Sequence, residues 1–243
     1  MRQKVRRRYR LRLAVGLVFA ASLSFTAGLT DVVGFLIAGD FVSFMSGNTT
    51  RLAIAVTDGE GDRVAHLAAV VAAFVLGNAA GVLIMRWTRG SHPALLLGIA
   101  LLIGGTAAAG GQTLTVLSLV FAMGALNIAL EEVAGHSVGV TYVTGALSRF
   151  GRGLGRTLLG QSSKGWWIQI VPWVGMAAGA LTGAFLWKGV GADAVYASAT
   201  SAAFLGLASL AIPRRWRLGY LIRRPYRKTP AAVRPAPDAA TPA

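Results

Sequence analysis

The sequence predicts an all-α polytopic membrane protein with about six transmembrane helices, arranged as two inverted three-helix repeats that each contain an interrupted, re-entrant helix. Composition gives the membrane class. Of the 243 residues, 54% are hydrophobic and only 14% are charged, whereas average soluble domains carry about a quarter charged residues. Internal similarity indicates the repeats, and the placement of basic residues indicates the number of crossings.

The first apolar span is residues 13–38, which exceed the roughly 20 residues that cross a bilayer. This run is too long for the h-region of a signal peptide, so we expect the protein to retain it. The later spans are expected at residues 64–84, 94–109, 114–130, 166–188 and 192–212.

Two further apolar segments are each interrupted by hydroxyl residues and glycine. They are residues 41–56 (FVSFMSGNTTRLAIAV) and residues 140–150 (VTYVTGALSRF). At an offset of 98 positions, Ser43 matches Thr141 and Gly47 matches Gly145. Duplicated broken helices, each preceded by a long apolar span, are typical of transporters built from internal repeats.

The formal charge of +15 is concentrated at the two ends of the chain. Residues 1–12 and 214–243 form basic tails, and the body between them is almost neutral. Such tails are expected on the cytoplasmic side, where they bind anionic lipid headgroups. No nucleic-acid-binding motif accompanies the charge, so we expect no nucleic-acid partner. The Pro/Ala-rich stretch after residue 229 is expected to be disordered.

Charge also decides between six and eight crossings. If both interrupted segments re-enter and leave on one side, every basic loop is cytoplasmic and the acidic loop at residues 58–62 is external. We therefore expect six spans with both termini in the cytoplasm. Since each repeat has three spans, the halves at residues 13–110 and 111–213 must be inverted relative to each other.

The predicted substrate site lies between the two interruptions, because non-helical backbone at membrane depth persists only where protein or a water-filled cavity satisfies it. Asp31 is a candidate proton or cation partner within this site. The alternative is that these small polar residues only join helices. The candidate residues are Asp31, Ser43, Ser46, Gly47, Asn48, Asn78, Asn127, Thr141, Thr144 and Gly145.

Glycines inside the apolar spans are expected to make close helix contacts rather than phosphate loops. At the 98-residue offset, Gly77 and Gly81 match Gly175 and Gly179. The helix-packing set is Gly77, Gly81, Gly175, Gly179 and Gly183.

Other polar residues are expected to be solvated or lipid-facing. His66 and His92 lie at span ends, where hydration or lipid contact is the default. Arg51 and Arg149 occupy equivalent positions and are expected to snorkel to the interface, with anion binding as the alternative. The spacing of Glu131, Glu132 and His136 is not that of a zinc protease, and we expect no catalytic residue, metal or cofactor.

The motifs resemble a known family. The run GLTDVVGFLIAGDFVSFMSGNTTRLAIAV, followed by MGALN (residues 123–127) and TYVTGAL (residues 141–147), is similar to the YoaK family of bacterial membrane proteins, also called DUF1275. The resemblance covers about residues 13–212 and implies a polytopic inner-membrane protein with about six helices. This chain departs from the usual pattern at Ser46, Leu126 and Val140, where Thr, Gln and Thr are common.

The leading functional hypothesis is a secondary transporter or permease of a small polar or charged solute in the plasma membrane. The chain has no Walker motif for ATP hydrolysis. The alternative is a non-transporting membrane scaffold or assembly protein that uses its Gly-rich faces and basic tails, and a homo-oligomer fits that role. An intramembrane enzyme would require Glu132 and His136 to converge on Ser137 or Asp31.

Overall fold

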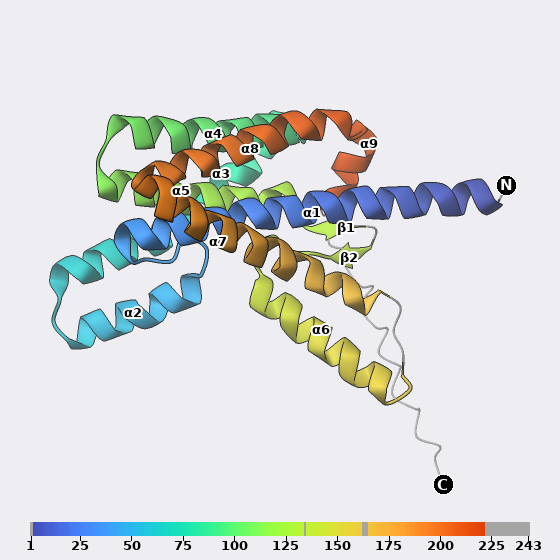
Figure 1. The fold of residues 1–243 in the computed structure, drawn as a ribbon, viewed down its shortest axis with the longest axis horizontal. Helices are drawn as coiled ribbons and strands as arrows, with labels where there is room; N and C mark the ends of the chain where they lie inside the picture. Colours follow the sequence, from blue (N-terminus) through green and yellow to red (C-terminus); the bar gives the residue numbers. More distant parts are fainter. Residues whose placement is uncertain (1, 134, 162–164, 222–243) are drawn as a thin grey trace, which may run out of the picture.

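The computed structural model describes residues 2–133, 135–161 and 165–221, and these form a helical bundle (Figure 1). The α-helices are α1 (Arg2–Ala38), α2 (Met45–Thr57), α3 (Gly61–Trp87), α4 (His92–Ala109), α5 (Gln112–Leu126), α6 (Val143–Leu158), α7 (Val171–Val190), α8 (Val195–Ala208) and α9 (Arg214–Arg217). The 3₁₀ turns are η1 (Asn127–Ala129), η2 (Trp166–Ile170), η3 (Gly191–Ala194), η4 (Ser209–Ala211) and η5 (Leu218–Tyr220). Two short antiparallel strands, β1 (Glu132–Val133) and β2 (His136–Ser137), complete the described elements.

Within the described residues, five helical stretches are long and apolar enough to cross a membrane. Four of them correspond to α1, α3, α4, and α5 with η1. The fifth, residues 166–211, contains both α7 and α8. Figure 1 shows these two helices as separate rods joined by a turn, so the stretch contains the fifth and sixth predicted spans.

Three helix pairs build the bundle: α1 packs along α7, α3 along α5, and α4 along α8. Small residues allow this close approach. A Cβ added at Gly28 of α1 would collide with the carbonyl oxygen of Met176 in α7, and a Cβ at Gly124 of α5 would collide with that of Phe74 in α3. The α1–α7 pair and the α3–α5 pair are therefore each held by an equivalent contact between a glycine and a backbone carbonyl.

A second pair of contacts follows the same pattern. Gly179 of α7 lies against the backbone of Phe25 in α1, and Gly77 of α3 lies against the backbone of Phe121 in α5. These contacts relate Gly77 to Gly179, one helical turn beyond the expected partner Gly175. The offset rises from 98 at Gly47 and Gly145 to 102 at Gly77 and Gly179, so the second half has four more residues between these two points.

The core lies around α5 and the second half of α1. From Thr115 onward, nearly all of α5 is buried, and α1 contributes fully buried side chains such as Leu23, Ala27 and Val33. The long side chains of α3 and α4 that point outward, for example Leu76 and Leu101, are exposed. An apolar exterior of this kind is expected of helices that face lipid.

The chain after α8 folds back onto the bundle. The ring of Tyr220 is fully buried and stacks on Phe19 with a centroid distance of 6.1 Å. The Tyr220 carbonyl accepts a hydrogen bond from the Glu131 amide at 2.9 Å. Residues 214–221 thus belong to the folded body, whereas the sequence predicted a tail from residue 214. The Pro/Ala-rich stretch lies outside the described residues.

Candidate functional site

The two segments that the sequence predicts to be re-entrant each consist of an extended stretch of chain followed by a short helix. Residues 39–44 connect α1 to α2, and residues 138–142 connect β2 to α6. Figure 1 shows α2 and α6 starting near the middle of the bundle and pointing towards opposite ends of it. The first turns of the two helices are therefore neighbours, although they are almost a hundred residues apart in sequence.

The interruption differs in position from the prediction. Ser46, Gly47 and Asn48, which were expected to be unwound, form the first turn of α2, and Thr144 and Gly145 form that of α6. The unwound residues are those immediately before each helix. The sequence pattern identified the right region but placed the break a few residues late, because a Ser-Gly-Asn run can also begin a helix.

Asp31 holds the first unwound segment in place. Its Oδ1 accepts hydrogen bonds from the Val42 amide at 2.8 Å, the Ser43 amide at 2.7 Å and the Ser43 hydroxyl at 3.1 Å. Backbone groups without helical partners are thereby satisfied inside the bundle. The prediction made Asp31 a solute partner, whereas the geometry uses this oxygen for the chain itself.

Asn48 completes this support from the other side. Its amide nitrogen donates to the Phe41 carbonyl at 2.6 Å, and its amide oxygen accepts from the Phe41 amide at 3.2 Å. The Asn48 side chain is fully buried. It therefore links α2 to the unwound segment through two hydrogen bonds.

The second half has a simpler version of this arrangement. Asn127, the counterpart of Asp31, accepts a hydrogen bond from the Thr141 hydroxyl at 2.7 Å, just as Asp31 accepts one from Ser43. The Ser24 hydroxyl donates to the Val140 carbonyl at 3.0 Å. Asn78 only donates to Phe74 in its own helix, at 2.9 Å.

One cavity of about 310 Å³ is lined by both unwound segments and both helix starts. Five of the ten predicted site residues line it, and the other five lie outside its lining. The lining residues are Ser43, Phe44, Met45 and Ser46 from the first half, Phe74 from α3, and Thr141, Tyr142, Val143, Thr144 and Gly145 from the second half.

The cavity offers hydrogen-bond donors and no charged lining side chain. The Ser46 and Thr144 side chains are exposed, and their hydroxyls both donate and accept. Neither α2 nor α6 has a side-chain cap at its N-terminus. The first amides of a helix carry partial positive charge when uncapped, so two such ends meet at this cavity.

A larger cavity, of about 430 Å³, lies elsewhere. It is bounded by the end of α1, the α4–α5 turn and the α7–α8 turn, and the side chains of Trp187, Asp193 and Tyr196 contribute to its lining. None of the predicted site residues lines it. Since it contacts neither re-entrant segment, we assign the candidate site to the smaller cavity.

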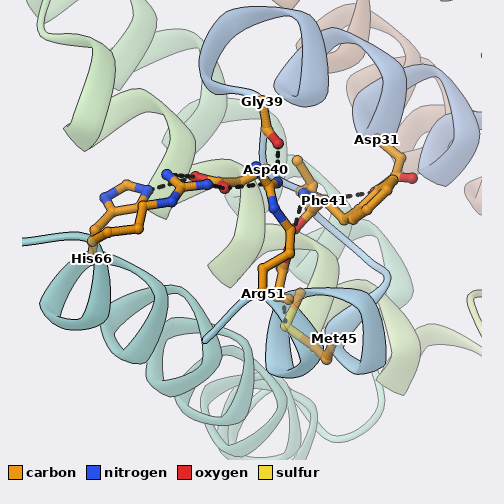
Figure 2. A network of polar contacts seen from close by, with 10 residues as sticks. Asp31, Gly39, Asp40, Phe41, Met45, Arg51 and His66 are labelled. Carbon is orange, nitrogen blue, oxygen red and sulfur yellow. Dashed lines mark hydrogen bonds and ion pairs between the residues drawn. The ribbon is translucent and has the colours of Figure 1, made fainter. Parts of the chain in front are cut away.

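The sequence reasoning missed a charged cluster centred on Asp40, which is fully buried. Asp40 Oδ1 lies 3.1 Å from Arg51 and 2.5 Å from Arg63, and Asp40 Oδ2 lies 2.6 Å from His66 Nε2. Arg51 also donates to the Gly39 carbonyl. Figure 2 shows the Arg51 and His66 side chains pointing at Asp40. The cluster joins the unwound segment to α2 and α3.

The Asp40 cluster corrects two expectations. Arg51 does not snorkel away from the protein, and His66 is bound to a carboxylate. The available signal was Asp40 itself, because a carboxylate within an apolar run requires a cationic or hydrogen-bonding partner. His92 was also misjudged: it is fully buried, and its Nε2 lies 2.8 Å from the Ala129 carbonyl oxygen.

The residues named for an enzyme are divided between two places. Glu132 pairs with Ser137, and His136 with Val133, across the β1–β2 strands, while Asp31 is bound to the unwound segment near Ser43. In the part of the chain that the structure describes, no group of three or more His, Cys, Asp or Glu side chains is placed to hold a metal ion.

Comparison with known proteins agrees with the motifs. Residues 19–209 match a family described as "Protein of unknown function (DUF1275)". The UPF0700 transmembrane protein RA0705 of Rhizobium meliloti (strain 1021) is 47% identical over 215 residues, which cover 88% of this chain and 95% of the relative. No solved structure matches the chain. The match spans the helical bundle and both re-entrant segments, so the chain belongs to the DUF1275 family of transmembrane proteins.

Proposed function

We propose that this protein is a secondary transporter or permease of a small polar or charged solute. The observation that carries the proposal is a cavity lined by both re-entrant segments. Broken helices that meet between internal repeats are a recurrent arrangement for transporter substrate sites. Here the two segments bring hydroxyls, uncapped helix ends and apolar side chains to one place.

The lining favours solutes that carry acceptor oxygens. The hydroxyls of Ser46 and Thr144 and the first amides of α2 and α6 are donors. A cation lies nearby as well, because a Cβ built at Gly145 would be 3.5 Å from the Arg149 guanidinium. Together these groups provide positive potential without a carboxylate in the lining.

Inverted repeats would supply the mechanism. The contact of Gly28 with Met176 in one pair of helices corresponds to the contact of Gly124 with Phe74 in the other. The hydrogen bonds of Asp31 and Asn127 correspond in the same way. Such a relation supports rocking of one half against the other about the cavity. In this scheme α2 and α6 alternately close it, from opposite ends of the bundle.

Accessibility of the cavity tests the proposal without knowledge of the solute. The sequence has no cysteine, so Ser46→Cys and Thr144→Cys each introduce one thiol. In oriented vesicles, alternating access predicts that each thiol reacts with a membrane-impermeant maleimide from either side. Leu101→Cys, on the exposed side of α4, should react from neither side. Reaction of Ser46→Cys and Thr144→Cys from one side only would contradict alternating access.

Flux measurements test the site itself. Purified protein in liposomes would be assayed for uptake of labelled amino acids, monocarboxylates and dicarboxylates, with the double variant Ser46→Val/Thr144→Val as the test. Thr182→Val is the matched control, because Thr182 is exposed and bonds only within α7. Transport in the wild type that persists unchanged in the double variant would remove this cavity as the site.

The scaffold alternative would use the Gly-rich faces and the basic tails. Two glycines of those faces, Gly77 and Gly179, are buried against helices of the same chain, which favours the helix-packing role expected for them. Substitution of either by Leu should therefore disrupt folding instead of a partner interface.

A further inference from the structure

Helix α6 is amphipathic along its whole length. Its apolar residues, Val143, Ala146, Leu147, Phe150, Leu154 and Leu158, recur every three or four positions and so lie on one face. Arg149, Arg152 and Arg156 lie on the opposite face. The helix contains no Asp or Glu, so its polar face is purely cationic.

Much of this helix has no protein partner among the described residues. Figure 1 shows α6 diverging from the bundle. Leu154 is 43% exposed and Leu158 is 79% exposed, and the side chains of Arg152 and Arg156 are also exposed. Arg149 differs, since its Nε donates to Gln169 at 2.7 Å. Free leucines therefore lie opposite two free guanidinium groups.

Tryptophans fix the orientation of this helix. Trp166 packs against Phe150 with a ring-centroid distance of 5.0 Å and contacts Gly153 at a position where a Cβ would collide. The adjacent Trp167 is half exposed. Trp side chains are enriched where membrane and water meet, which places the far half of α6 at that boundary.

We infer that the second half of α6, residues 152–158, lies at the membrane interface and binds anionic phospholipid. Leu154 and Leu158 enter the acyl region, and Arg152 and Arg156 contact headgroup phosphates. An amphipathic helix with a Lys/Arg-rich polar face and leucines opposite has the composition of such helices. Guanidinium groups bind phosphate oxygens through paired hydrogen bonds. This inference is independent of whether the protein transports a solute.

Native mass spectrometry of the full-length protein, released from nanodiscs of phosphatidylcholine with phosphatidylglycerol, tests the binding. The double variant Arg152→Gln/Arg156→Gln should retain at least twofold less phosphatidylglycerol than the wild type. The double variant Arg214→Gln/Arg215→Gln removes the same charge from exposed residues of α9. It should retain clearly more phosphatidylglycerol than the α6 double variant. Equal losses in the two double variants would overturn the inference, since they would indicate general charge attraction.

Depth measurements test the orientation. A spin label at Leu158→Cys should be relaxed more by dissolved oxygen than by a water-soluble nickel complex, because oxygen partitions into lipid. A label at Arg156→Cys, which is exposed on the cationic face of the same helix, should show the reverse. Equal exposure of both labels to the nickel complex would place α6 in water and overturn the inference.

Discussion

Asp40→Asn is expected to loosen the anchor of the first re-entrant segment. Asp40 is fully buried, and it accepts hydrogen bonds from Arg51 and Arg63 and contacts His66. Removing one partner of a buried ionic network costs about 3–5 kcal/mol. The Arg51 and Arg63 side chains remain 37% and 30% exposed, so water relieves part of their lost pairing. The low end, about 3 kcal/mol, is therefore expected.

The assay is thermal unfolding of purified protein in detergent, followed by intrinsic tryptophan fluorescence. For a chain of this size, 1 kcal/mol corresponds to about 2–4 °C in Tm, so Asp40→Asn should lower Tm by about 6–12 °C. Asp58→Asn is the matched control, because Asp58 is exposed and should change Tm by no more than about 1 °C. Equal Tm values for the two variants would refute the assignment of the Asp40 cluster as an anchor.

Three further perturbations follow from the geometry. Gly179→Leu should prevent folding, because a side chain there collides with the backbone of α1, whereas Gly98→Leu meets no neighbour within 4 Å and should leave the yield of monodisperse protein unchanged in size-exclusion chromatography. Asn48→Ala removes both hydrogen bonds to the unwound segment and should lower the free energy of unfolding by about 2–3 kcal/mol. An unchanged Tm in the same thermal assay would show that these two hydrogen bonds are not needed for stability. Burial raises the pKa of Tyr220 above its ordinary value of 10.0, so its neutral form stabilises the fold, and that stability is lost as pH rises through the raised pKa. Tyr220→Phe should lose less Tm than the wild type between pH 9 and pH 11, and identical alkaline losses would contradict this account.

Much of the fold could be predicted because hydrophobic length and basic residues are properties of local sequence. The positions of α3, α4 and α5 follow the predicted spans closely, and α1 contains the first predicted span but begins eleven residues earlier, at Arg2. The structure of residues 214–221 was harder to predict, because an Arg-rich stretch looks like a solvated tail. The burial of Tyr220 against Phe19 depends on a tertiary contact that no local pattern encodes.

The candidate site was predicted in part for a related reason. Duplication of the motif located Ser46 and Thr144, which the structure brings to the same cavity. The roles of Asp31 and Asn48 depend on how the chain bends back after α1. Sequence alone shows that such polar groups lie in an apolar region, but it does not show whether their partner is a solute or the backbone. In this structure the backbone is the partner for both.

The two re-entrant helices are anchored by different chemistry, and this difference bears on how the protein moves. Helix α2 is held by the charged contacts of Arg51 with Asp40. In α6 the equivalent Arg149 donates to neutral Gln169 at 2.7 Å, and Gln169 in turn donates to the Ser137 carbonyl at 3.2 Å. Both contacts use a charged guanidinium donor, but only the Arg51–Asp40 contact adds the attraction between opposite charges. If one segment opens more readily, it should therefore be α6, and hydrogen–deuterium exchange should be faster in the first turns of α6 than in those of α2. Faster exchange in α2 would mean that the Asp40 cluster does not control the motion.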